Sequence, residues 1–323
     1  AGCLQKGHVG SNPTLSATHS PFPNHSAVES AVMPWLAMDF SIMLPRSGWI
    51  LRLALGACLF GLAALTPAHG SEAEGGLRPE LEAFIAGMVA KHGFDADELA
   101  RIFGRARYSP TVIRAISAPS SALSWYEYRR AFVNDRRIRE GVKFWDAHAE
   151  TLARARQVYG VPEQIIAGVI GVETLYGARN GSFRVIDALT TLAFDYPQRA
   201  EFFLQELEEY LLLARELPLD AAQIKGSYAG AIGIPQFMPS SYRRHAVDFD
   251  GDGRSDLMRS AADAIGSVAN YLKAYGWEAD GPVAGPARVE GETFRFFVNG
   301  DIALRHTIDE LKQAGITPVD PVA

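Results

Sequence analysis

Cysteine is nearly absent from this sequence of 323 residues: the only two, Cys3 and Cys58, lie close to its beginning. The rest of the chain therefore contains no thiol. A disulfide framework, a cysteine-based zinc site and a thiol nucleophile are excluded from the main body of the protein.

An excess of positive charge is also absent. The chain has 31 Lys and Arg against 37 Asp and Glu, a formal net charge of −6, so no overall basic field marks a nucleic-acid binder, although a local basic cleft stays open. The eight histidines show no HExxH or comparable metal spacing, and no phosphate-cradling glycine motif occurs. No organic cofactor and no nucleic-acid partner are therefore expected. With 48% apolar and 21% charged residues, the composition is that of a globular protein.

From Ala1 to about Phe40, apolar residues do not recur at the spacing of a helix or a strand. This stretch begins with Ala1 instead of methionine and is rich in Ser, Pro, Asn and His. Residues 10–17 can be encoded by a sequence that resembles the end of a transfer-RNA gene. We therefore predict that residues 1–42 are a disordered extension read from upstream of the true start at Met33, Met38 or Met43.

A secretory signal peptide is predicted for residues 43–70. A mostly apolar run extends from Trp49 to Leu65, with Arg46 before it and Arg52 near its start. The run is short for a membrane span. The expected location is the periplasm after cleavage. A permanent membrane anchor is one alternative, and an outer-membrane lipoprotein is another, because Leu55-Gly56-Ala57-Cys58 resembles a lipobox.

Helical spacing dominates the rest of the chain. Apolar residues recur at helical positions from Pro79, Gly93 is placed to end that helix, and Asp95 with Glu98 predicts the start of the next. Alternation at Thr293–Phe296 predicts a small antiparallel sheet within residues 283–299. The fold class is therefore mainly α (α+β). Further helices are predicted at residues 123–131, 144–159, 162–177, 201–216 and 260–275.

Glu173 is an unusual carboxylate, because the eight residues from Ile165 to Val172 are all apolar or small. Desolvation favours the neutral form of such a group and raises its pKa, as a general acid near neutral pH requires. The alternative is a structural glutamate at the helix edge, paired with a cation such as Arg179.

A second unusual segment is Lys225–Tyr242, KGSYAGAIGIPQFMPSSY, whose glycines and prolines predict a loop that a ligand can approach closely. It contains both hydrogen-bonding and apolar side chains, a composition that suits a sugar. The alternative is a tight connection between helices with a buried glutamine. The side chains in question are Ser227, Tyr228, Gln236, Phe237 and Met238.

Together these segments resemble the lytic murein transglycosylase B family. The resemblance rests on VETLYG, on KGSYAGAIGIPQFMPSSY, on Asp187–Phe203 (DALTTLAFDYPQRAEFF) and on Asp263–Leu272 (DAIGSVANYL), and it covers roughly residues 78–280. It implies a lysozyme-like core at 146–280, an added helical domain at 78–145 and a small β element at 281–323. It also implies a peptidoglycan substrate, with other cell-wall enzymes as further partners of a monomeric chain.

By this resemblance, Glu173 is the single catalytic acid and base. The resemblance implies cleavage of the β-1,4 bond between N-acetylmuramic acid and N-acetylglucosamine, with a 1,6-anhydromuramoyl end as product. Ser227 would orient the acetamido group, and Gln236 would lie near the reactive centre. Tyr128 would be an aromatic of the cleft, or alternatively an ordinary aromatic in helix packing. Tyr228, Phe237 and Met238 are assigned to the cleft wall.

An acidic loop predicts a structural calcium ion. Every second residue from Asp248 to Asp256 matches a ligand position of an EF-hand-like loop, namely positions 1, 3, 5, 7 and 9, and Gly253 occupies the turn. Position 7 is Arg254, which would contribute only its backbone carbonyl. Position 12 is Arg259 instead of glutamate, and the resemblance makes Asp263 the closing ligand of a loop at 248–263. A sodium ion or an empty loop is the alternative. The predicted ligands are Asp248, Asp250, Asp252, Arg254, Asp256 and Asp263.

The C-terminal stretch departs from the family pattern. Members of the family usually continue beyond the β element with a helical, Tyr- and Asn-rich segment that lines the cleft. Here Leu304–Ala323 replaces that segment, or else the sequence is truncated. Two alternatives to transglycosylation stay open. One is a hydrolytic muramidase, because a lone glutamate can also direct water. The other, suggested by the short C-terminal stretch, is a catalytically dead, calcium-containing protein that binds peptidoglycan.

Overall fold

The computed structural model describes residues 77–117, 125–217, 219–297 and 306–320. The predicted N-terminal extension, the signal peptide and the lipobox cysteine Cys58 lie outside these ranges. Within them, every helix is either too short or too polar to traverse a bilayer.

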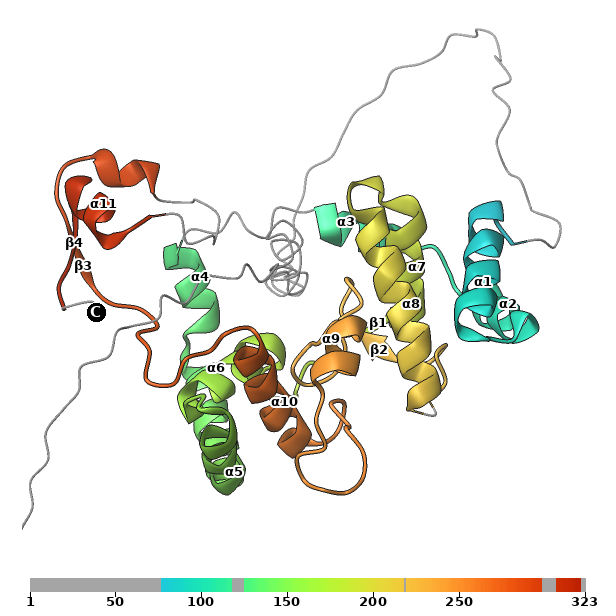
Figure 1. Cartoon of the computed structure of the whole chain (residues 1–323), viewed down its shortest axis with the longest axis horizontal. Coiled ribbons are helices and arrows are strands. Elements are labelled where there is room, and N and C mark those ends of the chain that lie inside the picture. The colour runs from blue at the N-terminus through green and yellow to red at the C-terminus, as the bar shows by residue number, and fades with distance from the viewer. Residues whose placement is uncertain (1–76, 118–124, 218, 298–305, 321–323) are drawn as a thin grey trace, which may run out of the picture.

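The described part of the chain is mostly helical, with two small antiparallel sheets (Figure 1). In chain order the elements are α1 (Pro79–His92), α2 (Ala96–Gly104), α3 (Pro110–Ser117), α4 (Trp125–Phe132), α5 (Asp135–Tyr159), α6 (Glu163–Thr174), β1 (Phe183–Arg184), α7 (Val185–Asp195), η3 (Pro197–Arg199), α8 (Ala200–Glu216), β2 (Lys225–Gly226), α9 (Pro239–His245), α10 (Ala261–Ala274), β3 (Ala287–Val289), η4 (Thr293–Phe296), α11 (Ile308–Gln313) and β4 (Ile316–Pro318).

Local end signals place several of these helices as predicted. Helix α1 ends before Gly93, whose φ of 63° is left-handed and therefore suits glycine. Helix α2 begins after Asp95, whose carboxylate accepts a hydrogen bond of 2.7 Å from the Glu98 N–H. Gly160 closes α5 in the same way as Gly93 closes α1.

Two predicted elements are corrected by the structure. The helix expected to reach Gly177 ends at Thr174, because the chain turns left-handed at Leu175. Thr293–Phe296 is a 3₁₀ helix and not a strand, with the Phe297 N–H donating to the Phe294 carbonyl at 2.9 Å. The small sheet forms instead between β3 and β4, which pairs Val289 with Ile316. Four residues of alternation specify a strand poorly when no neighbouring strand runs alongside.

The helices pack in groups (Figure 1). α5, α6 and α10 contact one another, α7 packs on α8, α8 packs on α9, and α1 pairs with α2. Helix α5 spans residues 145 and 146, where the sequence predicts the division between the helical domain and the lysozyme-like core. The helix is interrupted by non-helical backbone angles at His148. The break in α5 therefore lies close to that expected division.

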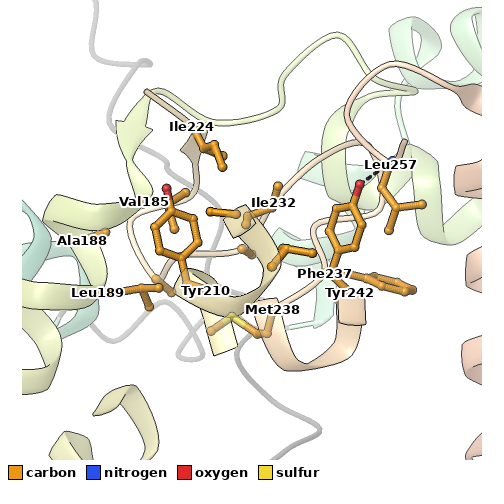
Figure 2. Close-up of a cluster of buried hydrophobic side chains, with 14 of the residues drawn as sticks. Val185, Ala188, Leu189, Tyr210, Ile224, Ile232, Phe237, Met238, Tyr242 and Leu257 are labelled. Carbon is orange, nitrogen blue, oxygen red and sulfur yellow. Dashed lines mark hydrogen bonds between the residues drawn. The ribbon is translucent and has the colours of Figure 1, made fainter. Parts of the chain in front are cut away.

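The segment between β2 and α9 rests on a buried apolar cluster (Figure 2). Ile232, Phe237 and Met238 from this segment are at most 4% exposed and belong to the same core as Leu189 of α7. Tyr242 adds polar anchors, since its hydroxyl accepts from the Leu257 N–H at 2.9 Å and donates to the Ser255 carbonyl at 2.7 Å. A loop held this way has little freedom to change shape.

Glycine is required at specific points of this segment. Gly233 has a φ of 79°, and a Cβ added there would overlap the carbonyl oxygen of Leu257. Gly233 also accepts a 2.8 Å hydrogen bond from the side chain of Gln236. The tight course of the loop therefore depends on the absence of a side chain at this position.

We expect Gly233→Ala to lower the free energy of unfolding by at least about 2 kcal/mol, because a left-handed backbone and a steric overlap both oppose the methyl group. Gly168→Ala is the matched control: Gly168 lies inside α6 with open space around its Cα. This change should leave stability unchanged or raise it by up to about 1 kcal/mol. Urea unfolding of both variants measures the difference, and equal stabilities would contradict the account of the loop.

Candidate active site

Glu173 occupies the last turn of α6, and its side chain is 6% exposed. The chain leaves the helix abruptly, with left-handed φ values of 52° at Leu175, 60° at Tyr176 and 84° at Gly177. The Tyr176 N–H closes the helix end on the Ile170 carbonyl at 3.3 Å. Glu173 is therefore fixed at a sharply terminated helix end.

The Tyr176 side chain is wedged between two helices. A Cβ on Gly141 of α5 or on Gly171 of α6 would overlap its hydroxyl group. The Tyr176 ring also lies 5.3 Å from that of Phe144, measured between centroids. This close approach holds the left-handed turn after Glu173 against both helices.

Burial makes Glu173 a weak acid. Loss of hydration raises the pKa of its carboxyl group to about 8, while the positive charge of Arg137 acts in the opposite direction. Among the described residues, Glu173 forms neither an ion pair nor a side-chain hydrogen bond. The alternative pairing with Arg179 is thus not present, and the nearby cation is Arg137. A group with this pKa is protonated at neutral pH and can donate a proton.

Thr174 connects this helix end to the glycine-rich loop. Its side chain is completely buried, and its hydroxyl donates to the Ile234 carbonyl at 2.7 Å and accepts from the Gly177 N–H at 2.9 Å. Because Thr174 follows Glu173 directly, this hydrogen bond fixes the backbone at Glu173 relative to the loop.

Ser227 organises the start of the loop. Its Oγ accepts hydrogen bonds from the N–H groups of Ala229 at 3.2 Å and Ala231 at 3.0 Å. Both accepting positions of the hydroxyl are then in use, which leaves its hydrogen to donate. Ser227 is half-buried, so a ligand carbonyl can approach this donor.

Gln236 is nearly buried and held in a left-handed conformation, with a φ of 53° and 4% exposure. Its Nε2 donates to the Gly233 carbonyl at 2.8 Å and to the Asn180 carbonyl at 3.3 Å. Both amide hydrogens are therefore directed at backbone. Its Oε1 is left as an acceptor whose position is fixed.

The aromatic and apolar candidates divide into two groups. Tyr128 is half-buried on α4 and stacks on Phe132 with 4.4 Å between ring centroids. Burial, and then the charge of Glu173, raises the pKa of Tyr128, which places it near the carboxyl group. Tyr228, Phe237 and Met238 are instead 2–4% exposed and lie in the core, so the structure favours a packing role for them beneath the loop.

Three of the predicted metal ligands converge. Ligand atoms of Asp248, Asp250 and Asp252 lie within 4.8 Å of one another. Asp248 also accepts hydrogen bonds of 2.7 Å from the N–H groups of Gly251 and Gly253, which curl the loop around it. Carboxylate oxygens gathered in this way are the donors that Ca²⁺ prefers.

The other predicted metal ligands lie outside this trio. Asp263 is 1% exposed and accepts from the N–H groups of Phe249 and Asp256, both at 2.8 Å. Asp256 itself accepts from the Met258 N–H at 3.0 Å. Arg254 follows the trio and donates its backbone N–H to Asp252 at 2.9 Å. Asp256 and Asp263 therefore brace the backbone of the acidic loop.

Known proteins are similar to this chain in both sequence and structure. A profile of the transglycosylase SLT domain matches residues 76–323. The chain is 43% identical to the membrane-bound lytic murein transglycosylase B of Escherichia coli (strain K12) over 278 residues, which cover 80% of this chain and 74% of the relative.

Solved structures show the same likeness. The soluble lytic transglycosylase SltB1 from Pseudomonas aeruginosa is 45% identical, with a TM-score of 0.70 and with 75% of this chain and 82% of that chain covered. The Escherichia coli lytic transglycosylase Slt35, solved in complex with calcium, is 45% identical, with a TM-score of 0.69 and coverage of 76% and 77%. These likenesses confirm the predicted mainly helical fold class with its lysozyme-like core.

We expect Thr174→Val to lower the free energy of unfolding by about 1–3 kcal/mol, because it leaves the buried Ile234 carbonyl and Gly177 N–H without their partner. Thr190→Val is the matched control, since the buried hydroxyl of Thr190 on α7 has no hydrogen-bond partner among the described residues. This control should be neutral or stabilising in the same thermal or urea unfolding experiment. A loss at Thr190 as large as that at Thr174 would refute the link.

Proposed function

The chain belongs to the transglycosylase SLT family as a lytic murein transglycosylase, and we propose that Glu173 is its single catalytic acid and base. The observation that carries this proposal is a nearly buried carboxyl group without an ion pair among the described residues, next to Thr174, which is hydrogen-bonded to the loop that holds Ser227 and Gln236. Burial raises the pKa of this group to about 8, as a proton donor at neutral pH requires. The substrate is the glycan of peptidoglycan.

In the first step, Glu173 gives its proton to the glycosidic oxygen between N-acetylmuramic acid and N-acetylglucosamine. The bond from C1 of the muramoyl sugar to that oxygen breaks, and the acetamido oxygen of the same sugar stabilises the positive charge that develops at C1. The Ser227 hydroxyl, whose two acceptor positions are occupied by backbone N–H groups, would orient this acetamido group.

In the second step, Glu173 is a carboxylate and acts as a base. It takes the proton from the 6-hydroxyl of the muramoyl sugar, and O6 bonds to C1 to form the 1,6-anhydro ring. Glu173 ends protonated, so the cycle consumes no water. Gln236 would accept a hydrogen bond from the sugar through its fixed Oε1, and Tyr128 would line the same cleft.

The surroundings favour one carboxylate over the pair that most glycosidases use. Among the described residues, only two other carboxyl groups, those of Glu206 and Asp263, are buried. Glu206 accepts from the Ser240 N–H at 2.9 Å and from its hydroxyl at 2.6 Å, and Asp263 accepts from the acidic loop. Both are therefore committed to structural hydrogen bonds.

We further propose that calcium binds the acidic loop in a structural role. The donor set fits, since Asp248, Asp250 and Asp252 bring three carboxylates together and the Arg254 carbonyl follows at the expected spacing. A calcium ion would neutralise their mutual repulsion. Asp256 and Asp263 would support the loop through its backbone N–H groups.

The proposed place of action is the periplasm, where murein is accessible to the enzyme. The name of the Escherichia coli relative, a membrane-bound murein enzyme, and the signal peptide predicted from the sequence support this location.

We expect Glu173→Gln to reduce turnover at least about a hundredfold, because it removes the proton that is transferred. Glu206→Gln is the matched control: glutamine can keep both hydrogen bonds to Ser240, so activity should be retained. Mass spectrometry of digested murein identifies the reaction, because anhydromuramoyl products are one water lighter than the reducing ends of hydrolysis. Full turnover by Glu173→Gln, or reducing ends from the unaltered enzyme, would overturn the mechanism.

The pH dependence has a definite sign. Since the first step needs protonated Glu173, kcat/KM should be constant below the pKa of about 8 and fall as pH rises through it. A pH-rate profile on purified murein tests this. Activity that rises across pH 7–9 would show that another group donates the proton.

Calcium should raise the melting temperature, and a chelator should reverse the rise. A concentration one hundred times the dissociation constant corresponds to about 2.7 kcal/mol of stabilisation. Asp252→Asn, which keeps the Oδ1 acceptor for the Arg254 N–H but loses the charge, should abolish most of this response. Asp146→Asn, an exposed carboxylate on α5, serves as the control. An equal calcium response in both variants would remove the acidic loop as the site.

A further inference from the structure

Arg137 reaches from α5 to the helix end that carries Glu173. It lies in the first turn of α5, where its backbone N–H caps onto the Asn134 side chain at 3.1 Å. Its Nη1 donates to the carbonyl oxygen of Gly171 and, at 3.4 Å, to that of Val172. These are the two residues immediately before Glu173.

The guanidinium group of Arg137 also packs against an aromatic ring. Its central carbon lies 4.8 Å from the centroid of the Phe132 ring, the same ring on which Tyr128 stacks. Arginine contributes a planar fork and an obligate positive charge. Carbonyl contacts at one end and an aromatic face beside it fix this charge close to Glu173.

The positive charge of Arg137 affects Glu173 electrostatically, although the two side chains form no direct contact among the described residues. No salt bridge joins Arg137 to Glu173 in the described part of the chain, yet the cation is close enough to oppose the effect of burial on the pKa of the carboxyl group. A contact ion pair would occupy the carboxyl oxygens and hold Glu173 ionised. A cation beyond hydrogen-bond distance leaves the oxygens free for substrate.

The other charged and titratable groups around this pair are few. Tyr128 of α4 lies close enough to interact electrostatically with both Glu173 and Arg137, and Tyr176, in the turn after α6, interacts with Arg137 in the same way. Burial, followed by the charges of Arg179 and Arg136, lowers the pKa of Arg137. Arg137 is thus the cation placed to respond to the ionisation of Glu173.

We propose that Arg137 is a positioning residue that holds the end of α6 and stabilises the carboxylate form of Glu173 between its two proton transfers. This proposal rests on the assignment of Glu173 as the catalytic acid and base. Burial alone favours the neutral acid and makes the first transfer costly, because a negative charge must appear in an apolar site. The fixed cation offsets that cost when the charge appears.

The test separates the charge of Arg137 from its hydrogen bonds. Arg137→Gln removes the positive charge. Arg137→Lys keeps the charge but loses the paired N–H donors of the guanidinium group. Arg139→Gln is the control, because it removes an exposed positive charge two residues further along the same helix. The titration of the Glu173 carboxyl is followed by ¹³C NMR of protein labelled at glutamate, with Glu173→Gln to assign the signal. The pH profile of kcat/KM is measured in parallel.

We expect Arg137→Gln to raise the midpoint of the Glu173 titration, and the alkaline fall of kcat/KM, by about one pH unit. Arg137→Lys should keep both midpoints near the original values while lowering the melting temperature, and Arg139→Gln should change neither. If Arg137→Gln does not fold, Arg137→Met, which keeps an apolar stem against Phe132, supplies the uncharged variant.

Two results would overturn the proposal: an unchanged midpoint in the uncharged variant, or the same shift in Arg137→Lys as in the uncharged variant. Both are distinct from failure of the proposed function, which would appear as turnover by Glu173→Gln. The NMR midpoint does not depend on activity, so the role of Arg137 is decided even if the reaction is assigned differently.

Discussion

The placement of one carboxyl group in an apolar site constrains the rest of this structure. Glu173 is nearly buried at the end of α6, where loss of hydration keeps it protonated. A buried carboxyl is useful only if its position is fixed, and three features share that task. Thr174 ties the helix end to the loop, Tyr176 wedges the following turn between two helices, and Arg137 binds the last carbonyls of α6.

The loop that Thr174 ties to the end of α6 departs from the usual behaviour of connections between helices. Loops generally lie at the surface and vary in shape, whereas the segment around Ile232 and Phe237 is buried in the core. Its polar backbone is satisfied internally, as in the paired hydrogen bonds between Ile232 and Phe237 at 2.8 and 3.0 Å. Ser227 and Gln236 are thus presented on a rigid support, so binding of the proposed sugar ligand there would cost little ordering entropy.

Features encoded by neighbouring residues could be predicted from the sequence. The cap formed by Asp95 and Glu98 and the glycine end at Gly93 are local, and both are found where the pattern indicates. Glu173 could be singled out because its apolar surroundings begin in its own helix. The mainly helical class follows from the same periodicity, and the family resemblance supplied the reaction.

Features that depend on contacts between distant segments could not be predicted in the same way. Arg137 lies 34 residues before Gly171 and on another helix, so no sequence pattern marks its contact with α6. Strand β4 was missed because three residues, Ile316–Pro318, are strand only through pairing with β3. The packing of Phe237 and Met238 was likewise invisible, since an apolar residue beside a site can face either ligand or core.

The wedge formed by Tyr176 has an evolutionary consequence. Its hydroxyl fills the space that a side chain at Gly141 of α5 or at Gly171 of α6 would need, so both helices depend on glycine where they approach this ring. Neither glycine can be exchanged alone without expelling that ring. Homologues with a larger residue at either glycine position should therefore carry a smaller one in place of Tyr176, and the three positions should covary.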